Sequence, residues 1–195
     1  MKSLYDIQSN ELKERLGKIQ LVATDFDGVW TDNRVIQNQD GSESIVRSRS
    51  DSLAIDLLNE SGLYNKKSYI ELQGKNPDSL DLVILSRETN PVVSSVAKKI
   101  SVKCQQSAYK KIDAFEDEIK SRGLEYSQVM FIGNDLNDIE CLRRVLGKGI
   151  AVAVNDSYPQ VVDVADYITR RKGGDGAVRE AIELILYAKG KHPYP

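Results

Sequence analysis

Short apolar runs and amphipathic segments alternate along most of the chain. Four apolar runs, each followed by polar residues, are typical of buried strands and lie at 21–24, 82–85, 129–132 and 150–154, with shorter strands expected around Val102 and at 167–168. Segments with a helical spacing of apolar residues lie between them, at 91–99, 111–122, 138–146, 159–164 and 177–189. Strands that alternate with such helices form βαβ units. The pattern therefore predicts an α/β fold: a single doubly wound (Rossmann-like) parallel sheet with helices on both faces.

The segments around the first strand (21–24) break this alternation. Residues 1–17 are expected to hold an N-terminal helix, because Leu12 and Leu16 lie one turn apart among charged residues. Residues 33–48 have the pattern of two short strands joined by an Asp-Gly turn, which predicts a β-hairpin. Such a hairpin could overhang a site as a flap, but it is too short to be a cap domain.

Two polar segments and one further helix complete the pattern. Ser50-Asp51-Ser52 offers N-cap residues in front of an apolar run, so a helix is expected to begin there. Residues 64–80 are polar and predict a surface insertion, which could be an oligomer contact, a substrate lid or a tolerated loop; we favour the loop. Residues 189–195 form a tail. Since no linker or repeat divides the 195 residues, we expect one domain.

Composition narrows the class of protein. Hydrophobic residues make up 41% and charged residues 29% of the chain, as in ordinary globular proteins. A net charge of −2, from 27 basic and 29 acidic residues, gives no electrostatic reason to bind nucleic acid or an anionic membrane. No apolar run is long enough to span a bilayer, and no signal peptide is recognised, so a cytoplasmic location is expected. Cys104 and Cys141 are interpreted as inert thiols.

The most informative motif follows the first predicted strand. Asp25 and Asp27 are two residues apart, and Gly28 allows the chain to turn away. Ligands of open parallel sheets bind beyond the carboxyl ends of the strands, so these acids occupy a position where chemistry is usually performed. They could hold a hard cation such as Mg²⁺, or one could act as a nucleophile while the other handles a proton. The alternative is a simple turn after a strand.

Three later segments at the ends of predicted strands carry groups that would complement these acids. Ser86 follows the strand at 82–85 and could bind a phosphate oxygen or cap a helix. Lys110 and Lys111 open a helix, where the macrodipole disfavours cations, and they belong to an anion site or a solvated basic patch. The acid-rich run 133–138 could complete a Mg²⁺ site or form a turn and a helix cap. The same order of groups at four strand ends favours a site.

In the order of these polar groups along the chain, the sequence resembles the haloacid dehalogenase superfamily of phosphohydrolases. The resemblance covers residues 20–189, approximately. The chain is most similar to the capless branch of Kdo 8-phosphate phosphatase, sialic acid and KDN 9-phosphate phosphatases, and the C-terminal domain of some CMP-sialic acid synthetases. The matching motifs are Asp25-Phe-Asp-Gly-Val-Trp-Thr-Asp32, Ser50-Asp-Ser52, Ile84-Leu-Ser-Arg-Glu-Thr-Asn90, Gly133-Asn-Asp-Leu-Asn-Asp138, Ala151-Val-Ala-Val-Asn-Asp156 and Gly173-Gly-Asp-Gly-Ala-Val-Arg-Glu180.

The resemblance implies a role for each matching residue. Asp25 would be the nucleophile that forms an aspartyl-phosphate, and Asp27 would protonate the leaving sugar oxygen and then activate water. Ser86 would hold a phosphate oxygen. Lys111, preferred to Lys110 on the spacing of the following residues, would neutralise the phosphoryl group.

The implied cofactor is Mg²⁺, and the implied partner is a phosphorylated acidic sugar. The metal ligands would be Asp25, Asp27 through its backbone carbonyl, Asn134 and Asp135, although many relatives have aspartate where Asn134 stands. The residues assigned to substrate binding are Gly28, Ser50, Asp51, Arg87, Glu88 and Arg179. The branch is typically a homo-oligomer, a tetramer in which the hairpin and tail of one subunit approach the site of its neighbour.

The function predicted from this resemblance is a Mg²⁺-dependent phosphatase acting on the terminal phosphate of an acidic keto sugar. Ser50-Asp-Ser52 and Glu88 favour sialic acid or KDN 9-phosphate over Kdo 8-phosphate, because arginine tends to occupy the corresponding places on the Kdo side. The alternative is a weakly active or inactive oligomerisation module related to the synthetase domain, which Asn134 keeps open. A phosphate-transferring mutase is disfavoured, since such relatives usually carry a cap domain.

Overall fold

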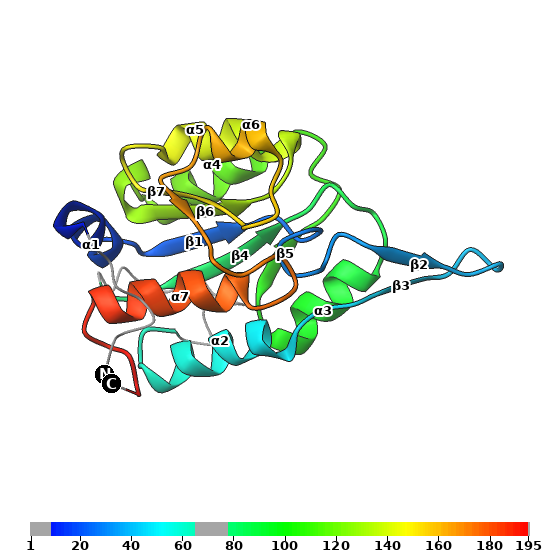
Figure 1. Cartoon of the computed structure of the whole chain (residues 1–195), viewed down its shortest axis with the longest axis horizontal. Coiled ribbons are helices and arrows are strands. Elements are labelled where there is room, and N and C mark those ends of the chain that lie inside the picture. The colour runs from blue at the N-terminus through cyan, green and yellow to red at the C-terminus, as the bar shows by residue number, and fades with distance from the viewer. Residues whose placement is uncertain (1–8, 65–77, 195) are drawn as a thin grey trace.

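Six parallel strands form one twisted sheet at the centre of the molecule (Figure 1). The computed structural model describes residues 9–64 and 78–194. The strands lie in the order β5-β4-β1-β6-β7-β8, and every pairing between neighbours is parallel. Their bounds are β1 (Leu21–Thr24), β4 (Asp81–Leu85), β5 (Lys103–Gln105), β6 (Val129–Gly133), β7 (Ile150–Ala153) and β8 (Tyr167–Ile168). The predicted fold class is confirmed.

Helices cover both faces of the sheet and form two layers (Figure 1). The lower layer contains α1 (Asn10–Gly17), α2 (Arg49–Glu60), α3 (Val92–Ile100) and α7 (Ala177–Ala188). The upper layer contains α4 (Lys111–Arg122), α5 (Ile139–Val145) and α6 (Pro159–Val162), and short 3₁₀ turns lie at Tyr126–Gln128 and Leu136–Asp138.

Each layer encloses its own apolar core, because alternate strand residues point to opposite faces. In β1, Leu21 and Ala23 pack in the core of the upper layer, whereas Val22 packs in the core of the lower layer. The central strands are therefore buried on both sides, as a parallel sheet requires.

The predicted hairpin consists of β2 (Val35–Gln37) and β3 (Glu43–Ile45), paired antiparallel. Gly41 adopts a φ of 81° in the turn, a conformation that glycine reaches without strain. The hairpin projects from the carboxyl edge of the sheet, well beyond the helical layers (Figure 1). Within residues 9–64 and 78–194 this is the largest excursion above that edge, and no cap domain is present.

Some element boundaries differ from those predicted. Helix α2 begins at Arg49, and its N-cap is Ser48, whose Oγ accepts a hydrogen bond from the backbone N–H of Ser50. Ser50-Asp51-Ser52 therefore lies inside the first turn, which frees the Asp51 carboxylate for a contact outside its own helix. Helix α1 starts at Asn10 after the N-cap Ser9; residues 1–8 of the predicted N-terminal helix, and 65–77 of the predicted insertion, lie outside the described residues.

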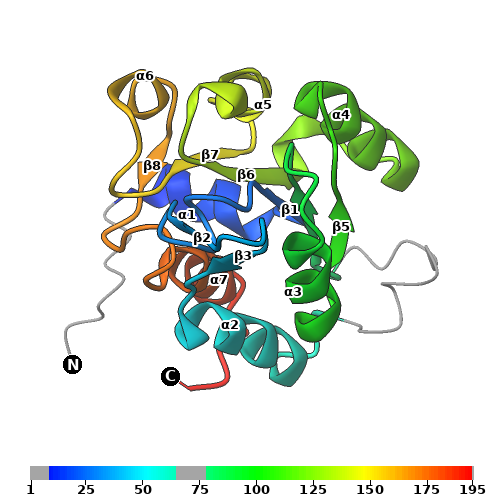
Figure 2. The same ribbon diagram turned by 90° about the vertical axis from the view of Figure 1, so that its right-hand side faces the viewer.

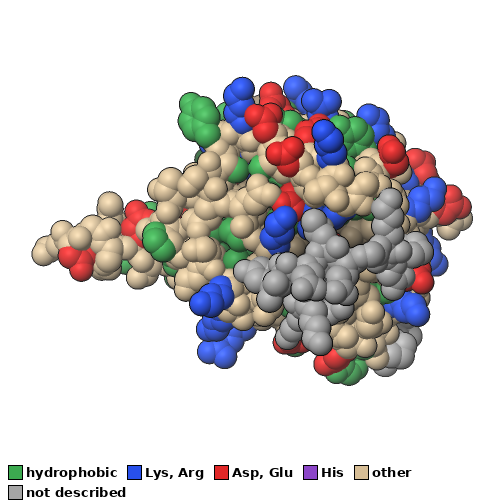
Figure 3. Space-filling view, turned by 180° about the vertical axis from the view of Figure 1, so that it is seen from behind, with side chains coloured by type: hydrophobic (Ala, Val, Ile, Leu, Met, Phe, Trp, Pro, Cys, Tyr) green, Lys and Arg blue, Asp and Glu red, His purple; other side chains and the backbone are tan. Residues whose placement is uncertain are grey.

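The surface carries mixed charge. Seen from behind, Lys and Arg side chains are interspersed with Asp and Glu over the upper part of the molecule (Figure 3), in line with the small net charge of −2. None of the helices in the described part of the chain combines the length and the apolar character that crossing a bilayer demands.

Candidate active site

The turn after β1 is built to present two acids. Asp25 extends the sheet through a 2.9 Å hydrogen bond from its N–H to the Ile132 carbonyl oxygen, and its side chain is buried. Thr31 Oγ1 then accepts a 3.1 Å hydrogen bond from the N–H of Gly28, which closes the turn. Gly28 has a φ of 77°, and a Cβ there would lie 2.0 Å from Nδ2 of Asn134. Only glycine fits this position.

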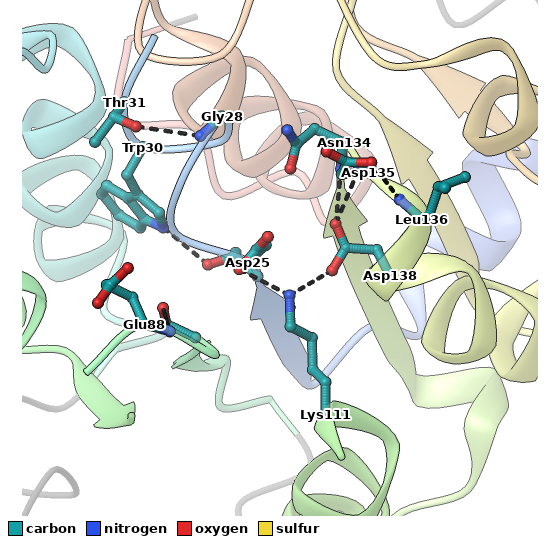
Figure 4. A network of polar contacts seen from close by, with 12 residues as sticks. Asp25, Gly28, Trp30, Thr31, Glu88, Lys111, Asn134, Asp135, Leu136 and Asp138 are labelled. Atoms are coloured by element: carbon teal, nitrogen blue, oxygen red, sulfur yellow. Dashed lines mark hydrogen bonds and ion pairs between the residues drawn. The ribbon is translucent and has the colours of Figure 1, made fainter. Parts of the chain in front are cut away.

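A buried lysine meets the first acid from the neighbouring helical layer (Figure 4). Lys111 opens α4, and its Nζ lies 2.8 Å from Oδ1 of Asp25 and 2.6 Å from Oδ1 of Asp138. Lys110, one residue earlier, is exposed. Burial alone would lower the pKa of Lys111, but the two carboxylates outweigh it and hold the pKa above its usual value. The lysine is therefore a fixed cation.

The second partner of this lysine, Asp138, was not among the predicted site residues. Its Oδ2 accepts hydrogen bonds from the backbone N–H groups of Asn134 (2.9 Å) and Asp135 (3.2 Å). The prediction that Asp138 could cap the helix α5 is wrong, because its carboxylate makes no capping bond there. It instead completes a capping box with Asp135 at the 3₁₀ turn Leu136–Asp138. The signal in the sequence was the second acid in the run 133–138, but the direction of its side chain depends on the fold of that loop.

The site holds more negative than positive charge. Two buried carboxylates, Asp25 and Asp138, share the single ammonium of Lys111. Burial, together with the Asp138 charge, raises the pKa of Asp25, and Lys111 only partly opposes this. Asp27 is half-buried, and its pKa is raised by burial and by the charge of Glu88. Such a centre favours a further cation.

Asn134 and Asp135 supply oxygens on the other side of the turn (Figure 4). Oδ1 of Asn134 is buried and has no hydrogen-bond partner among the described residues. Asp135 is partly exposed, and its Oδ1 accepts a 2.6 Å hydrogen bond from the N–H of Leu136. The described residues contain no group of three or more His, Cys, Asp or Glu residues arranged for a metal. A cation here would therefore depend on an amide oxygen and a backbone carbonyl as well as carboxylates, a set that suits a hard ion.

The loop after β4 carries three of the predicted residues. Ser86 is buried, and its Oγ accepts a 3.0 Å hydrogen bond from the N–H of Glu88, which leaves its own proton free to donate. The Arg87 guanidinium lies 5.2 Å from the centre of the exposed Tyr109 ring. Hydrogen bonds from the N–H groups of Asn90 and Thr89 hold the Glu88 carboxylate and lower its pKa.

Two predicted substrate residues have other partners in this structure. Asp51 is fully buried, and its carboxylate accepts 3.1 Å hydrogen bonds from the N–H groups of Gly176 and Arg179 at the start of α7. The Arg179 side chain pairs with Glu183 at 2.9 Å. Asp51 thus joins α2 to α7, while Ser50 beside it is exposed.

The chain matches the haloacid dehalogenase-like hydrolases over residues 8–182. It belongs to this family. Over 187 residues the hydrolase is 29% identical to 3-deoxy-D-manno-octulosonate 8-phosphate phosphatase of Escherichia coli K12. The match covers 96% of this chain and 89% of that protein. The predicted resemblance is confirmed.

Solved structures agree with this membership. The 3-deoxy-D-manno-octulosonate 8-phosphate phosphatase of Moraxella catarrhalis, solved in complex with magnesium ion, phosphate ion and KDO, matches with 31% identity, a TM-score of 0.78 and coverage of 93% of both chains. The Yersinia pestis enzyme of the same name matches with 27% identity and a TM-score of 0.81, over 95% of this chain and 90% of that one. The hydrolase is therefore a phosphoric monoester hydrolase, and the comparisons support a sugar phosphatase of the haloacid dehalogenase type.

Proposed function

We propose that this hydrolase removes the terminal phosphate of an acidic keto sugar, either Kdo 8-phosphate or a sialic acid or KDN 9-phosphate, through an aspartyl-phosphate on Asp25. The observation that carries the proposal is the buried Lys111 ammonium, 2.8 Å from Asp25 at the carboxyl edge of the sheet. A fixed cation beside a carboxylate is what phosphoryl transfer requires, because catalysis consists largely of positioning and charge neutralisation.

The proposed steps use the side chains described above. In the first step, a carboxylate oxygen of Asp25 bonds to phosphorus, the bond from phosphorus to the sugar oxygen breaks, and Asp27 gives that oxygen a proton. In the second step, water attacks phosphorus, its proton passes to Asp27, and the bond to Asp25 breaks. Ser86 Oγ donates to a phosphate oxygen throughout. The raised pKa of Asp27, caused first by burial, supports its role as the initial proton donor.

The proposed cofactor is Mg²⁺. Asp25, the Asp27 backbone carbonyl, Asn134 and Asp135 would hold it, and it would neutralise charge on the phosphoryl oxygens. The buried, unpartnered Oδ1 of Asn134 supports this assignment, as does the excess negative charge around Lys111.

We also propose a homo-oligomer, a tetramer by resemblance to the capless branch, in which the hairpin of one subunit approaches its neighbour. The projecting hairpin supports this, because its apolar side chains Val35 and Ile36 are 55% and 56% exposed. Apolar side chains on an exposed arm favour contact with another protein surface.

A weakly active assembly module remains the second candidate, and Asn134 favours it. An amide oxygen carries no formal charge and binds a divalent cation less strongly than a carboxylate. The two candidates predict opposite results for turnover of any phosphate ester.

The test is phosphate release, with and without Mg²⁺, from Kdo 8-phosphate, sialic acid 9-phosphate, KDN 9-phosphate and neutral sugar phosphates. We expect metal-dependent release from one acidic sugar, and loss of at least about 10⁴-fold in kcat for Asp25→Asn. Asp117→Asn, an exposed acid on α4, is the matched control. Full activity of Asp25→Asn would exclude the nucleophile, and negligible release from the folded, unmodified protein would favour the assembly module.

A further inference from the structure

Two loops border the base of the hairpin from opposite sides (Figure 2). One joins β8 to α7 and spans 169–176; the other joins β4 to α3. The first is packed directly on the nucleophile turn, since a Cβ on Gly173 would lie 1.9 Å from the carbonyl oxygen of Gly28. The N–H of Gly174 also donates to the Val29 carbonyl oxygen at 3.0 Å. Residues of this loop are therefore held close to the reaction centre.

This loop carries a run of three exposed cations, Arg170, Arg171 and Lys172. The backbone of Arg171 is fixed at both ends: its N–H donates to Glu180 at 3.0 Å, and its carbonyl oxygen accepts a 2.6 Å hydrogen bond from Thr169 Oγ1. Its side chain is exposed and forms no ion pair with the described residues. Its guanidinium therefore stands on a rigid backbone without an ion pair in the described part of the chain, which leaves it available to a ligand.

Arg171 also lies beside a residue that was already a substrate candidate. A Cβ built on Gly176 would be 3.8 Å from Cγ of Arg171 and 3.9 Å from Cβ of Ser50. The arginine stem and the start of α2 therefore flank the same glycine. Ser50 itself is neutral, and Asp175 is the acid of the loop, so Arg171 and Lys172 leave the exposed part of this loop with more positive than negative charge.

The opposite side of the hairpin base is acidic. Glu88 lies on the same side of the site as Trp30 (Figure 4), with its carboxylate held by the N–H groups of Thr89 and Asn90. Glu43 of β3 is fixed by a 2.7 Å hydrogen bond from Nδ2 of Asn90. Both carboxylates lie near enough to Asp27 for their charges to act on it. A substrate carboxylate placed on this side would meet like charge, which is unfavourable.

We infer that Arg171 and Lys172 bind the carboxylate of the acidic sugar and thereby determine substrate specificity, while the Glu43 and Glu88 side receives its hydroxyl groups. This inference rests on the proposed function. A keto sugar acid carries its carboxylate at the end of the carbon chain away from the phosphate ester, so its recognition requires a second cationic position displaced from Lys111. The loop at 169–176 provides one, and guanidinium binds carboxylate in a two-pronged geometry.

The test compares the double variant Arg171→Gln/Lys172→Gln with the unmodified protein on two substrates. The first is the acidic keto sugar phosphate with the highest turnover, and the second is a neutral hexose phosphate. We expect the ratio of the two kcat/KM values to fall by about tenfold, mainly through KM of the acidic substrate, as for loss of a partly exposed charge-assisted contact. The matched control is Arg143→Gln, an exposed arginine on α5 outside the site.

Three other results would overturn the inference. An unchanged ratio, with metal-dependent turnover retained, refutes the carboxylate site but leaves the proposed function intact. An equal loss on both substrates, together with a smaller particle in light scattering, assigns the cations to a subunit contact instead. Absence of turnover with every ester in the unmodified protein removes the proposed function, and the inference with it.

Discussion

The buried carboxylate of Asp51 makes the stability of this protein depend on pH in an unusual direction. Burial raises the pKa of Asp51 to about 6 from 3.8, although hydrogen bonds from the start of α7 oppose the shift. A carboxyl whose folded pKa is raised contributes stability that is fully present below its unfolded pKa and is lost as the pH rises through its folded pKa. The Asp51 contribution should therefore disappear between about pH 4 and pH 7.

The size of the effect follows from the shift. About two pKa units correspond to about 3 kcal/mol, of which about 2 kcal/mol falls between pH 4 and pH 7.5. Asp51→Asn removes the titration but keeps one acceptor oxygen for the N–H groups of Gly176 or Arg179. The free energy of unfolding of the unmodified protein, minus that of Asp51→Asn, should fall by about 2 kcal/mol over this range.

Urea unfolding at half-unit pH steps measures this difference. Asp56→Asn, an exposed acid on the same helix, is the control and should show a flat difference. A difference for Asp51→Asn that stays flat, or that rises with pH, would refute the reasoning. A rise would mean that the helix N-terminus stabilises the ionised form more than burial destabilises it.

Three further predictions concern the site. Gly28→Ala should abolish turnover and cost about 1–3 kcal/mol of stability, measured by denaturation, because of the positive φ and the clash with Asn134. Lys111→Gln leaves two buried carboxylates without their cation and should cost about 3–5 kcal/mol, whereas exposed Lys110→Gln should change stability little. Asn134→Asp should tighten Mg²⁺ binding, seen as a larger metal-induced rise in Tm; an unchanged rise would exclude this residue as a ligand.

The sequence was sufficient to predict the parallel sheet and the polar residues at its strand ends, because apolar runs and turn residues are local signals. Lys111 could be chosen over Lys110 by spacing, and the structure places it against Asp25. Asp138 and Asp51 could not be assigned in this way. Both are acids near a helix start, where a capping role is the common one, but both carboxylates turn to partners that only the assembled loops provide.

The parallel register explains why the acids and the lysine meet. Thr24 is level with Ile84 of β4 and Ile132 of β6, so the three strands end within one residue of each other and present the residues that follow at one edge. The alternation of side chains along β1 determines which way Asp25 points. Leu21 and Ala23 face the upper layer, and Asp25 continues that series toward α4, which carries Lys111. A shift of one residue in β1 would turn Asp25 toward the lower layer, away from its cation. The chemistry therefore depends on strand register as much as on the identity of the acids.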